Sequence, residues 1–474
     1  MIEITALIAG ILYGLVIGII PAAGATTGLV ATYAVLPVFI ADPYAGVIFL
    51  MAVVAASTTA DSFTSILLGI PGANSSAATM VDGFPLAQQG RASYAISAAV
   101  TTSTVNGLLW GGIVFLFLPY YTELVLFFGI PELWAFTVLA LATVGFLSTD
   151  KPVRSIVAIG AGIFVGLVGV DPTTNDPRFT AGWFYLQDGI QLIPVVAGLF
   201  AVPELIEGFK KRQATSHVVR SERIEGMRAV WQNRWLSLRG GFIGAIVGLL
   251  PGLGGAVSDW LAYGQTVALN KNEQFGNGNI KGVIGPEGSN NAQKATSMLP
   301  TVIFGIPGAP FAAVLMGLFL YMGFDLGSPD LMYDDKFFQS LSIGFLTATL
   351  FVGIFSLLFV NLVCKITSVP YVYYFPLLLA MIVWASMQYT GGWEDLVVLG
   401  IFSVLGFTMK SYKYSRPAFL VAFILADKVE NLSIQLFTIY NWDMLGDRYL
   451  FIALITLTII TFIYSIMKGK TNYA

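Results

Sequence analysis

The sequence predicts an all-α polytopic membrane protein, and three observations lead to that fold class. The chain has 474 residues, of which 56% are hydrophobic. Only 11% are charged, whereas about a quarter of the residues of a soluble globular domain are charged. Apolar stretches recur along the whole chain, and a bilayer span needs roughly 20 mostly apolar residues, so the chain can supply about ten to twelve crossings. The composition therefore argues against a water-soluble fold.

The composition also argues against several classes of function. The only histidine, His217, lies in a charged loop, so His-based metal sites and His-dependent catalytic triads are not expected. The only cysteine, Cys364, cannot form an internal disulfide. No P-loop motif is present, and a net charge of −3 without a basic segment of domain size gives no reason to expect nucleic-acid binding. We expect no cofactor, and no metal other than a coupling Na⁺.

A basic segment divides the chain. Residues 208–239 contain eight Lys or Arg against Glu222 and Glu225, so the positive-inside rule places this segment in the cytoplasm. The predicted division is a first transmembrane repeat at 1–207, a basic cytoplasmic linker at 208–239, and a second transmembrane repeat with a C-terminal helix at 240–474. We interpret the N-terminus as the first membrane helix and not as a cleaved signal peptide.

The charges of the other loops predict their sides of the membrane. Working outward from the basic segment, the acidic stretches 171–188 and 325–335 fall outside. Lys410, Lys413, Arg416 and the C-terminal tail fall in the cytoplasm, as does Arg91. This alternation predicts a multi-pass protein of the cell (plasma) membrane with its C-terminus in the cytoplasm.

Two motifs occur twice in the same order. Residues 14–24 (GLVIGIIPAAG) resemble residues 244–254 (GAIVGLLPGLG), at an offset of 230. Residues 65–73 (SILLGIPGA) resemble residues 301–309 (TVIFGIPGA), at an offset of 236. Together with the loop charges, the duplication predicts two inverted structural repeats with broken helices. Such breaks at corresponding positions indicate re-entrant hairpins that meet at a midplane site, as in secondary transporters.

The residues beside the breaks define the candidate sites. Mid-span Gly and Pro free backbone groups that must face protein, water, an ion or a substrate. Half-helix N-termini attract anions, whereas carbonyls, hydroxyls and carboxylates can hold a cation such as Na⁺. The candidate substrate-binding residues are Thr26, Thr27, Asn74, Ser75, Ser76, Ser258, Asn290, Asn291, Pro307 and Gly308. The candidate ion-coupling residues are Asp61, Thr58, Thr59, Asp259, Thr296 and Ser297. The alternative is that the breaks are only kinks and points of close packing.

Asp61 is a carboxylate in an otherwise apolar segment, next to several hydroxyl side chains. An ionisable residue at this depth is by default a functional hypothesis. We expect Asp61 to be either a Na⁺ ligand or a proton carrier. Two structural alternatives remain: Asp61 lies in a solvated turn between helices, or it caps the helix that follows, since Asp is a preferred N-cap residue.

With these motifs assembled, the chain resembles the large membrane subunit of the tripartite tricarboxylate transporters, the TctA family. The most specific motif is Pro-Glu-Gly-Ser-Asn-Asn-Ala at 286–292, followed by the proline- and glycine-containing stretch 300–308. Ile-Pro-Gly at 70–72, the stretch 82–91, and Asp171 with Arg178 also match. The chain departs from the family at 59–62, where Thr-Ala-Asp-Ser replaces the usual Tyr-Gly-Gly-Ser.

The resemblance implies import of di- and tricarboxylates driven by an ion gradient. It also implies two partners, a small membrane subunit and an extracytoplasmic solute-binding protein. The sequence leaves a homo-oligomer open. We therefore expect a secondary active transporter for a small di- or tricarboxylate, coupled to Na⁺ or H⁺. The alternatives are a passive anion channel and a membrane-embedded enzyme, although neither paired catalytic aspartates nor a zinc motif is present.

Overall fold

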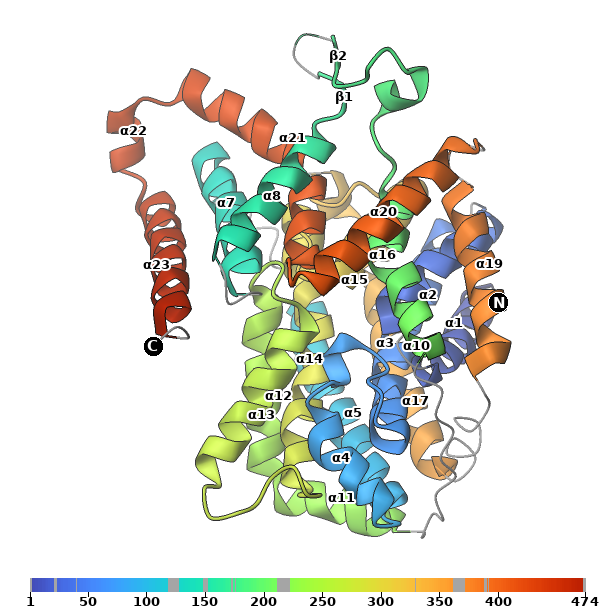
Figure 1. The fold of residues 1–474 in the computed structure, drawn as a ribbon. Coiled ribbons are helices and arrows are strands. Elements are labelled where there is room, and N and C mark those ends of the chain that lie inside the picture. The colour runs from blue at the N-terminus through green and yellow to red at the C-terminus, as the bar shows by residue number, and fades with distance from the viewer. Residues whose placement is uncertain are drawn as a thin grey trace.

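The structure is a computed structural model, and it describes residues 2–471 apart from several short segments. The segments left out are 21–23, 40, 118–127, 148–151, 172–173, 175, 211–221, 329, 361–370, 388–389 and 391. Described residues are almost all helical, as predicted, and the strands are limited to one two-stranded antiparallel hairpin (Figure 1). His217 and Cys364 lie outside the described residues.

The first half begins with long apolar helices and ends with short ones. Its main helices are α1 (Ile2–Ile19), α2 (Gly24–Thr32), α3 (Pro43–Leu68), α4 (Thr79–Gln88), α5 (Ala92–Phe117), α7 (Ile130–Leu147), α8 (Pro152–Gly166), α9 (Leu192–Val196) and α10 (Val202–Lys210). Short turns of other helix types are η1 (Tyr33–Phe39), η2 (Asn74–Ser76), η4 (Phe184–Asp188) and η5 (Ala197–Ala201). Strands β1 (Gly169–Val170) and β2 (Pro177–Arg178) pair Gly169 with Arg178.

The second half follows the basic segment, part of which is helical. Its helices are α11 (Arg223–Gln232), α12 (Arg234–Leu249), α13 (Gly254–Leu269), α14 (Lys281–Phe304), α15 (Pro310–Tyr321), α16 (Asp335–Ser342), α17 (Ala348–Leu358), α19 (Tyr374–Met387), α20 (Glu394–Ser411), α21 (Arg416–Ile439), α22 (Trp442–Gly446) and α23 (Tyr449–Thr471). The short turns here are η6 (Asp330–Tyr333), η7 (Ile343–Thr347) and η8 (Tyr371–Tyr373).

Several described helices are suited to a membrane. Four are long and apolar enough to cross a bilayer: Ile2–Ile19, Pro43–Leu68, Ala92–Phe117 and Asp335–Leu358. Shorter apolar helices of 10–17 residues accompany them, among them Pro310–Tyr321 and Phe375–Met387. The protein is thus an all-α polytopic membrane protein, and many of its spans are broken into shorter pieces.

The breaks lie where the sequence predicts them. Helix α3 ends at Gly69 and helix α14 at Gly305, and both glycines have left-handed backbone angles, φ 62° and 57°. Glycine adopts this conformation without the steric penalty that a Cβ atom brings. The Pro-Gly pairs at 71–72 and 307–308 follow immediately and lie between helices. Residues 21–23 of the first predicted break lie outside the described residues.

Glycines on α1 and α12 allow close packing against α3 and α14. A Cβ atom added at any of three glycines on each helix would lie 2.2–2.8 Å from a backbone carbonyl oxygen of the partner helix. The contacts are Gly10, Gly14 and Gly18 with Phe49, Val53 and Ser57, and Gly240, Gly244 and Gly248 with Gly285, Ser289 and Gln293. Each glycine pair is offset by 230 residues and each partner pair by 236. These are the two offsets of the sequence motifs.

Side-chain hydrogen bonds join helices α3 and α14. The Asn290 side-chain amide donates to the Thr58 carbonyl and to Asp61 Oδ1, at 3.3 and 3.2 Å. The Asn291 amide donates to Thr59 Oγ1 at 2.9 Å. Almost every residue of α14 is buried, including the charged residue Glu287. The polar centre of the fold is therefore enclosed by protein.

Contacts between loops join segments that the charges place on the same side. Tyr185, in the acidic stretch 171–188, donates to Asp395 at the start of α20 at 2.7 Å. Arg91 pairs with Glu222, beside the basic segment, at 2.8 Å. Lys410 pairs with Glu207 at the end of α10, which leads into that same segment, at 2.6 Å.

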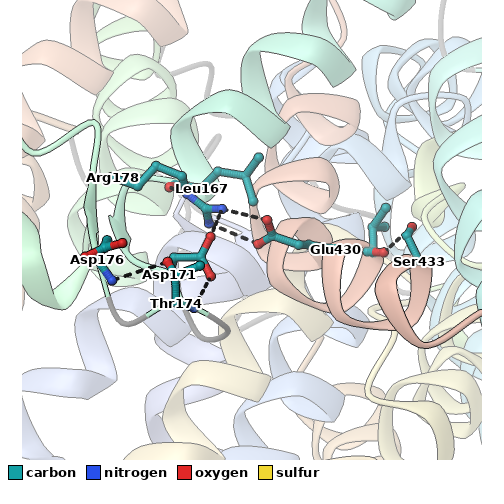
Figure 2. A network of polar contacts seen from close by, with 8 residues as sticks. Leu167, Asp171, Thr174, Asp176, Arg178, Glu430 and Ser433 are labelled. Atoms are coloured by element: carbon teal, nitrogen blue, oxygen red, sulfur yellow. Dashed lines mark hydrogen bonds and ion pairs between the residues drawn. The ribbon is translucent and has the colours of Figure 1, made fainter. Parts of the chain in front are cut away.

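Arg178 fastens the β-hairpin to α21 (Figure 2). Its guanidinium group donates to both carboxylate oxygens of Glu430, at 2.6 and 3.0 Å, and to Asp171 Oδ2 at 3.0 Å. A further N–H donates to the Leu167 carbonyl at 2.9 Å. The hydrogen bonds to Glu430 raise the pKa of the Arg178 guanidinium. Asp171 and Arg178, which match the family in sequence, thus stabilise the position of the β-hairpin on α21.

Candidate functional site

A cavity lies where three helices begin. Its volume is about 90 Å³, and its wall includes the first residues of α2, α13 and α15: Gly24, Gly254 and Pro310. The first N–H groups of a helix have no partner within that helix and carry the positive end of its dipole. Three such ends around one cavity make it attractive to an anion.

Lys294 supplies a positive charge to this cavity. It comes from α14, is only 7% exposed, and is part of the cavity wall. Its ammonium group lies 4.7 Å from the centre of the Phe311 ring, and no carboxylate of the described residues is within ion-pair distance of it. A buried ammonium without a paired anion is costly, and an anionic ligand in the cavity would compensate it.

Three buried carboxylates lie close to one another, and two of them, Asp61 and Asp259, lie near Lys294. Asp61, Asp259 and Glu287 are each 0–1% exposed and come from α3, α13 and α14. Both halves of the chain contribute to this acidic cluster. If the three carboxylates and the Lys294 ammonium group are all ionised, their net charge is −2. A bound cation would reduce this negative charge.

The hydrogen bonds within the acidic cluster leave several buried atoms without partners. Asp61 accepts from Ser75 Oγ at 3.2 Å and from Asn290. Glu287 Oε1 accepts from Thr79 Oγ1 at 2.8 Å. Among the described residues, no hydrogen-bond partner is present for Asp259 Oδ1, Glu287 Oε2, Asn290 Oδ1 or the amide group of Gln293. Free oxygens of this kind are the ligands that a hard cation requires.

Two of the predicted substrate-binding side chains reach the cavity. Thr26 and Ser75 form part of its wall. Because Ser75 also donates to Asp61, it connects the cavity to the acidic cluster. The side chain of Asn74 lies outside the described part of the structure.

The other predicted substrate-binding residues lie around the cavity without forming its wall. Asn290, Asn291 and Ser76 contact α3 in the layer behind it. Ser258 Oγ donates to the Gly255 carbonyl at 2.9 Å, and Thr27 Oγ1 is buried without a partner among the described residues. The second hairpin is held at Pro307-Gly308, where the Gly308 N–H donates to Thr301 Oγ1 at 3.1 Å.

The predicted ion-coupling residues divide in the same way. Asp61 and Asp259 belong to the acidic cluster, and Thr58 and Thr59 lie beside it through the Asn290 and Asn291 contacts. The hydroxyl groups of Thr296 and Ser297 donate to carbonyls of their own helix, those of Ala292 and Lys294.

Neither structural alternative for Asp61 agrees with the structure. Asp61 lies within the continuous helix α3 and is 1% exposed, so it is not in a solvated turn. It does not cap the following helix, because Asp259 Oδ2 accepts from the Ala78 N–H at 2.7 Å, where α4 begins. Helix α3 continues past Asp61 to Leu68, and the hydroxyl groups of Thr64 and Ser65 donate to the Asp61 carbonyl.

Lys294, Glu287 and Gln293 were not among the site residues predicted from the sequence. The signal was present, since Glu287 lies within the specific motif at 286–292. Their polarity sets them apart from the apolar stretches that predict membrane helices. Among the described residues, no group of three or more His, Cys, Asp or Glu side chains is placed to hold a metal ion by itself.

Comparisons with known proteins identify the family. The family described as "Tripartite tricarboxylate transporter TctA family" matches residues 4–421. An Agrobacterium vitis protein described as "Uncharacterized 52.8 kDa protein in TAR-I ttuC' 3'region" is 29% identical over 435 residues, covering 89% of this chain and 84% of that protein. A second, from the TAR-II ttuC' 3' region of the same organism, is 28% identical over 191 residues, covering 40% and 78%. No solved structure matches.

Proposed function

Because this chain belongs to the tripartite tricarboxylate transporter TctA family, we propose that it imports a small di- or tricarboxylate as a secondary active transporter, driven by a Na⁺ or H⁺ gradient. The family is a transporter family and not an enzyme family, so the chain is a component of a tricarboxylate transporter and the enzyme alternative is set aside. We propose the position of the substrate site, the coupling ion and the sides of the membrane on which the loops lie.

The observation that carries the proposal is the ammonium group of Lys294 in the cavity. A substrate carboxylate placed there would contact one full positive charge and the N-terminal ends of α2, α13 and α15. Thr26 and Ser75 would donate hydroxyl hydrogen bonds to the same anion. Because Lys294 is buried, its interaction with the anion is less screened than it would be at the surface.

We place ion coupling at the acidic cluster of Asp61, Asp259 and Glu287. A Na⁺ ion would take the unpaired carboxylate and amide oxygens, whereas H⁺ would bind one of the carboxylates. Ser75 links the two sites, since it lies in the cavity wall and donates to Asp61. A cation bound at Asp61 would compete for the oxygen that Ser75 now contacts and would release its hydroxyl group toward the substrate.

The proposed architecture is two inverted repeats, 1–207 and 240–474, joined by a cytoplasmic linker. The matching glycine contacts on α1 and α12, with their offsets of 230 and 236, support the duplication. The stretch after the first Pro-Gly pair is basic, at Arg91, whereas the stretch after the second is acidic, at 325–335. This opposite charge supports the inversion. In this arrangement the 171–188 and 325–335 stretches are extracytoplasmic.

The proposed partners are those of a tripartite system in the cell (plasma) membrane. A small membrane subunit and an extracytoplasmic solute-binding protein would complete the transporter, with the latter docking on the extracytoplasmic side. The description of the family as tripartite supports this part of the proposal.

Uptake by purified protein in proteoliposomes tests the proposed function. Radiolabelled citrate and succinate are offered with a Na⁺ gradient, with a pH gradient, and with neither. We expect accumulation above equilibrium with one gradient only, and loss of uptake in Lys294→Met. Lys271→Met is the matched control, because Lys271 is exposed outside the cavity. Flux that only equilibrates the anion, whatever the gradient, would indicate a passive channel instead.

A further inference from the structure

A second cationic group lies just behind the cavity wall, away from Lys294. Arg416 begins α21 and is 9% exposed. Three of its neighbours belong to the wall: Pro417, which follows it in the chain, Glu204, and Phe200, whose ring centre is 5.0 Å from the Arg416 Cζ atom. Glu204 therefore separates the Arg416 guanidinium from the cavity.

The ion pair between Arg416 and Glu204 is a loose one. A single contact joins Arg416 Nη2 to Glu204 Oε1 at 3.4 Å, whereas a charge-assisted hydrogen bond is usually about 2.7–2.9 Å long. Arg178 and Glu430 of the same protein form two bonds, of 2.6 and 3.0 Å. Arg416 Nη1 donates to the Leu199 carbonyl at 2.9 Å. A guanidinium has five N–H donors, so most of those on Arg416 have no close acceptor among the described residues.

In the present arrangement of charges around the cavity, a substrate with two carboxylates would be attracted at one end and repelled at the other. Lys294 attracts one carboxylate of a substrate, but Glu204 would repel a second carboxylate that reached its part of the wall. If that second carboxylate displaces Glu204 from Arg416, the new anion takes the free guanidinium donors, and the Glu204 carboxylate has to turn away from it or bind a proton. The pair to be broken has a single long contact, so Arg416 can form shorter hydrogen bonds with an incoming carboxylate than it now forms with Glu204.

We infer that Arg416 is the binding residue for a second substrate carboxylate and that Glu204 occupies its guanidinium until the substrate arrives. This inference rests on the proposed function, because it assumes that the cavity is the substrate site. It assigns the preference for di- and tricarboxylates over monocarboxylates to one arginine. Lys294, by contrast, would bind any carboxylate.

A matched pair of ligands isolates the second carboxylate. Succinate and succinamate have the same length and differ only in one carboxylate, which is an amide in succinamate. Their affinities are measured by isothermal titration calorimetry on purified full-length protein, for wild type, Lys294→Met, Arg416→Gln and Glu204→Gln. Lys410→Gln is the control, since it breaks the neighbouring Lys410–Glu207 pair, which is about a third exposed and outside the cavity wall.

We expect wild type to prefer succinate by about tenfold or more, the value of one charge-assisted interaction. Arg416→Gln should reduce that ratio to near one while succinamate binding stays unchanged. Glu204→Gln should strengthen succinate binding, because it frees Arg416 and removes the repulsion. Lys294→Met should weaken both ligands, and Lys410→Gln should behave as wild type.

The outcomes separate this inference from the proposed function. An unchanged succinate preference in Arg416→Gln, or weaker succinate binding in Glu204→Gln, would overturn the assignment of Arg416 while leaving the substrate site intact. Unchanged binding of both ligands in Lys294→Met would overturn the substrate site itself. A wild-type protein that binds neither ligand would overturn both. If Arg416→Gln does not fold, Glu204→Gln decides alone, since it retains the size and hydrogen bonding of the side chain.

Discussion

Replacing Gly244 by alanine should destabilise the protein, because α12 and α14 are in backbone contact there. The new Cβ atom would lie 2.3 Å from the Ser289 carbonyl oxygen, 2.7 Å from Ser289 Cα and 2.9 Å from its carbonyl carbon. All three atoms are backbone, so no side chain can move aside and the helices must separate. Overpacking of this kind costs about 1–3 kcal/mol.

The melting temperature in detergent measures this effect. The entropy of unfolding scales with chain length, to about 1 kcal/mol per degree for 474 residues, so Gly244→Ala should lower the melting temperature by about 1–3 °C. Gly264→Ala is the control, because nothing lies within 4 Å of a Cβ there and alanine is the better helix former. A Gly244→Ala protein as stable as Gly264→Ala would refute the close packing.

Three further changes test other parts of the structure. Asp61→Asn should fold and bind substrate but lose the dependence of uptake on the ion gradient, and normal coupling in proteoliposomes would remove Asp61 from the ion site. Glu430→Gln should loosen the β-hairpin, since a neutral amide cannot form two charge-assisted bonds with Arg178; faster exchange of the backbone amide hydrogens of Asp176 and Arg178 is the expected result, and unchanged exchange would contradict it. Gly255→Ala should weaken succinate binding, because its methyl group would lie 2.5 Å from Ser75 Cβ and 3.2 Å from Lys294 Nζ, two residues of the cavity wall; calorimetry with wild-type affinity in folded protein would show that the cavity is not the binding site.

The breaks in the helices could be predicted because their cause is local. Gly69 and Gly305 end their helices with left-handed backbone angles, and the proline that follows each by two residues prevents continuation. The two copies of the motif then indicated the duplication without any structure. The resemblance to the family rests on the same motifs.

Helix α14 was the main feature that the sequence could not reveal. Hydropathy identifies helices that face lipid, but residues 281–304 are buried against other helices and tolerate Glu287, Asn290 and Lys294. Their cost is offset by partners from distant parts of the chain, such as Thr79 and Asp61. A local pattern contains no information about such partners, so the acidic cluster was predicted only through Asp61 and Asp259.

The hydrogen bonds that join the two halves also bear on how the protein is made. Asp61 and Thr79 leave the ribosome early, whereas Glu287 and Asn290 follow more than 200 residues later, which at about 5–20 residues per second is a delay of roughly 10–40 s. During that time the first half holds a membrane-embedded carboxylate that has only part of its final set of partners. The first half is therefore not a separate folding unit, and its insertion is completed only by the arrival of α14. A gene cut at the basic linker should yield a stable protein only when both fragments are synthesised in the same cell.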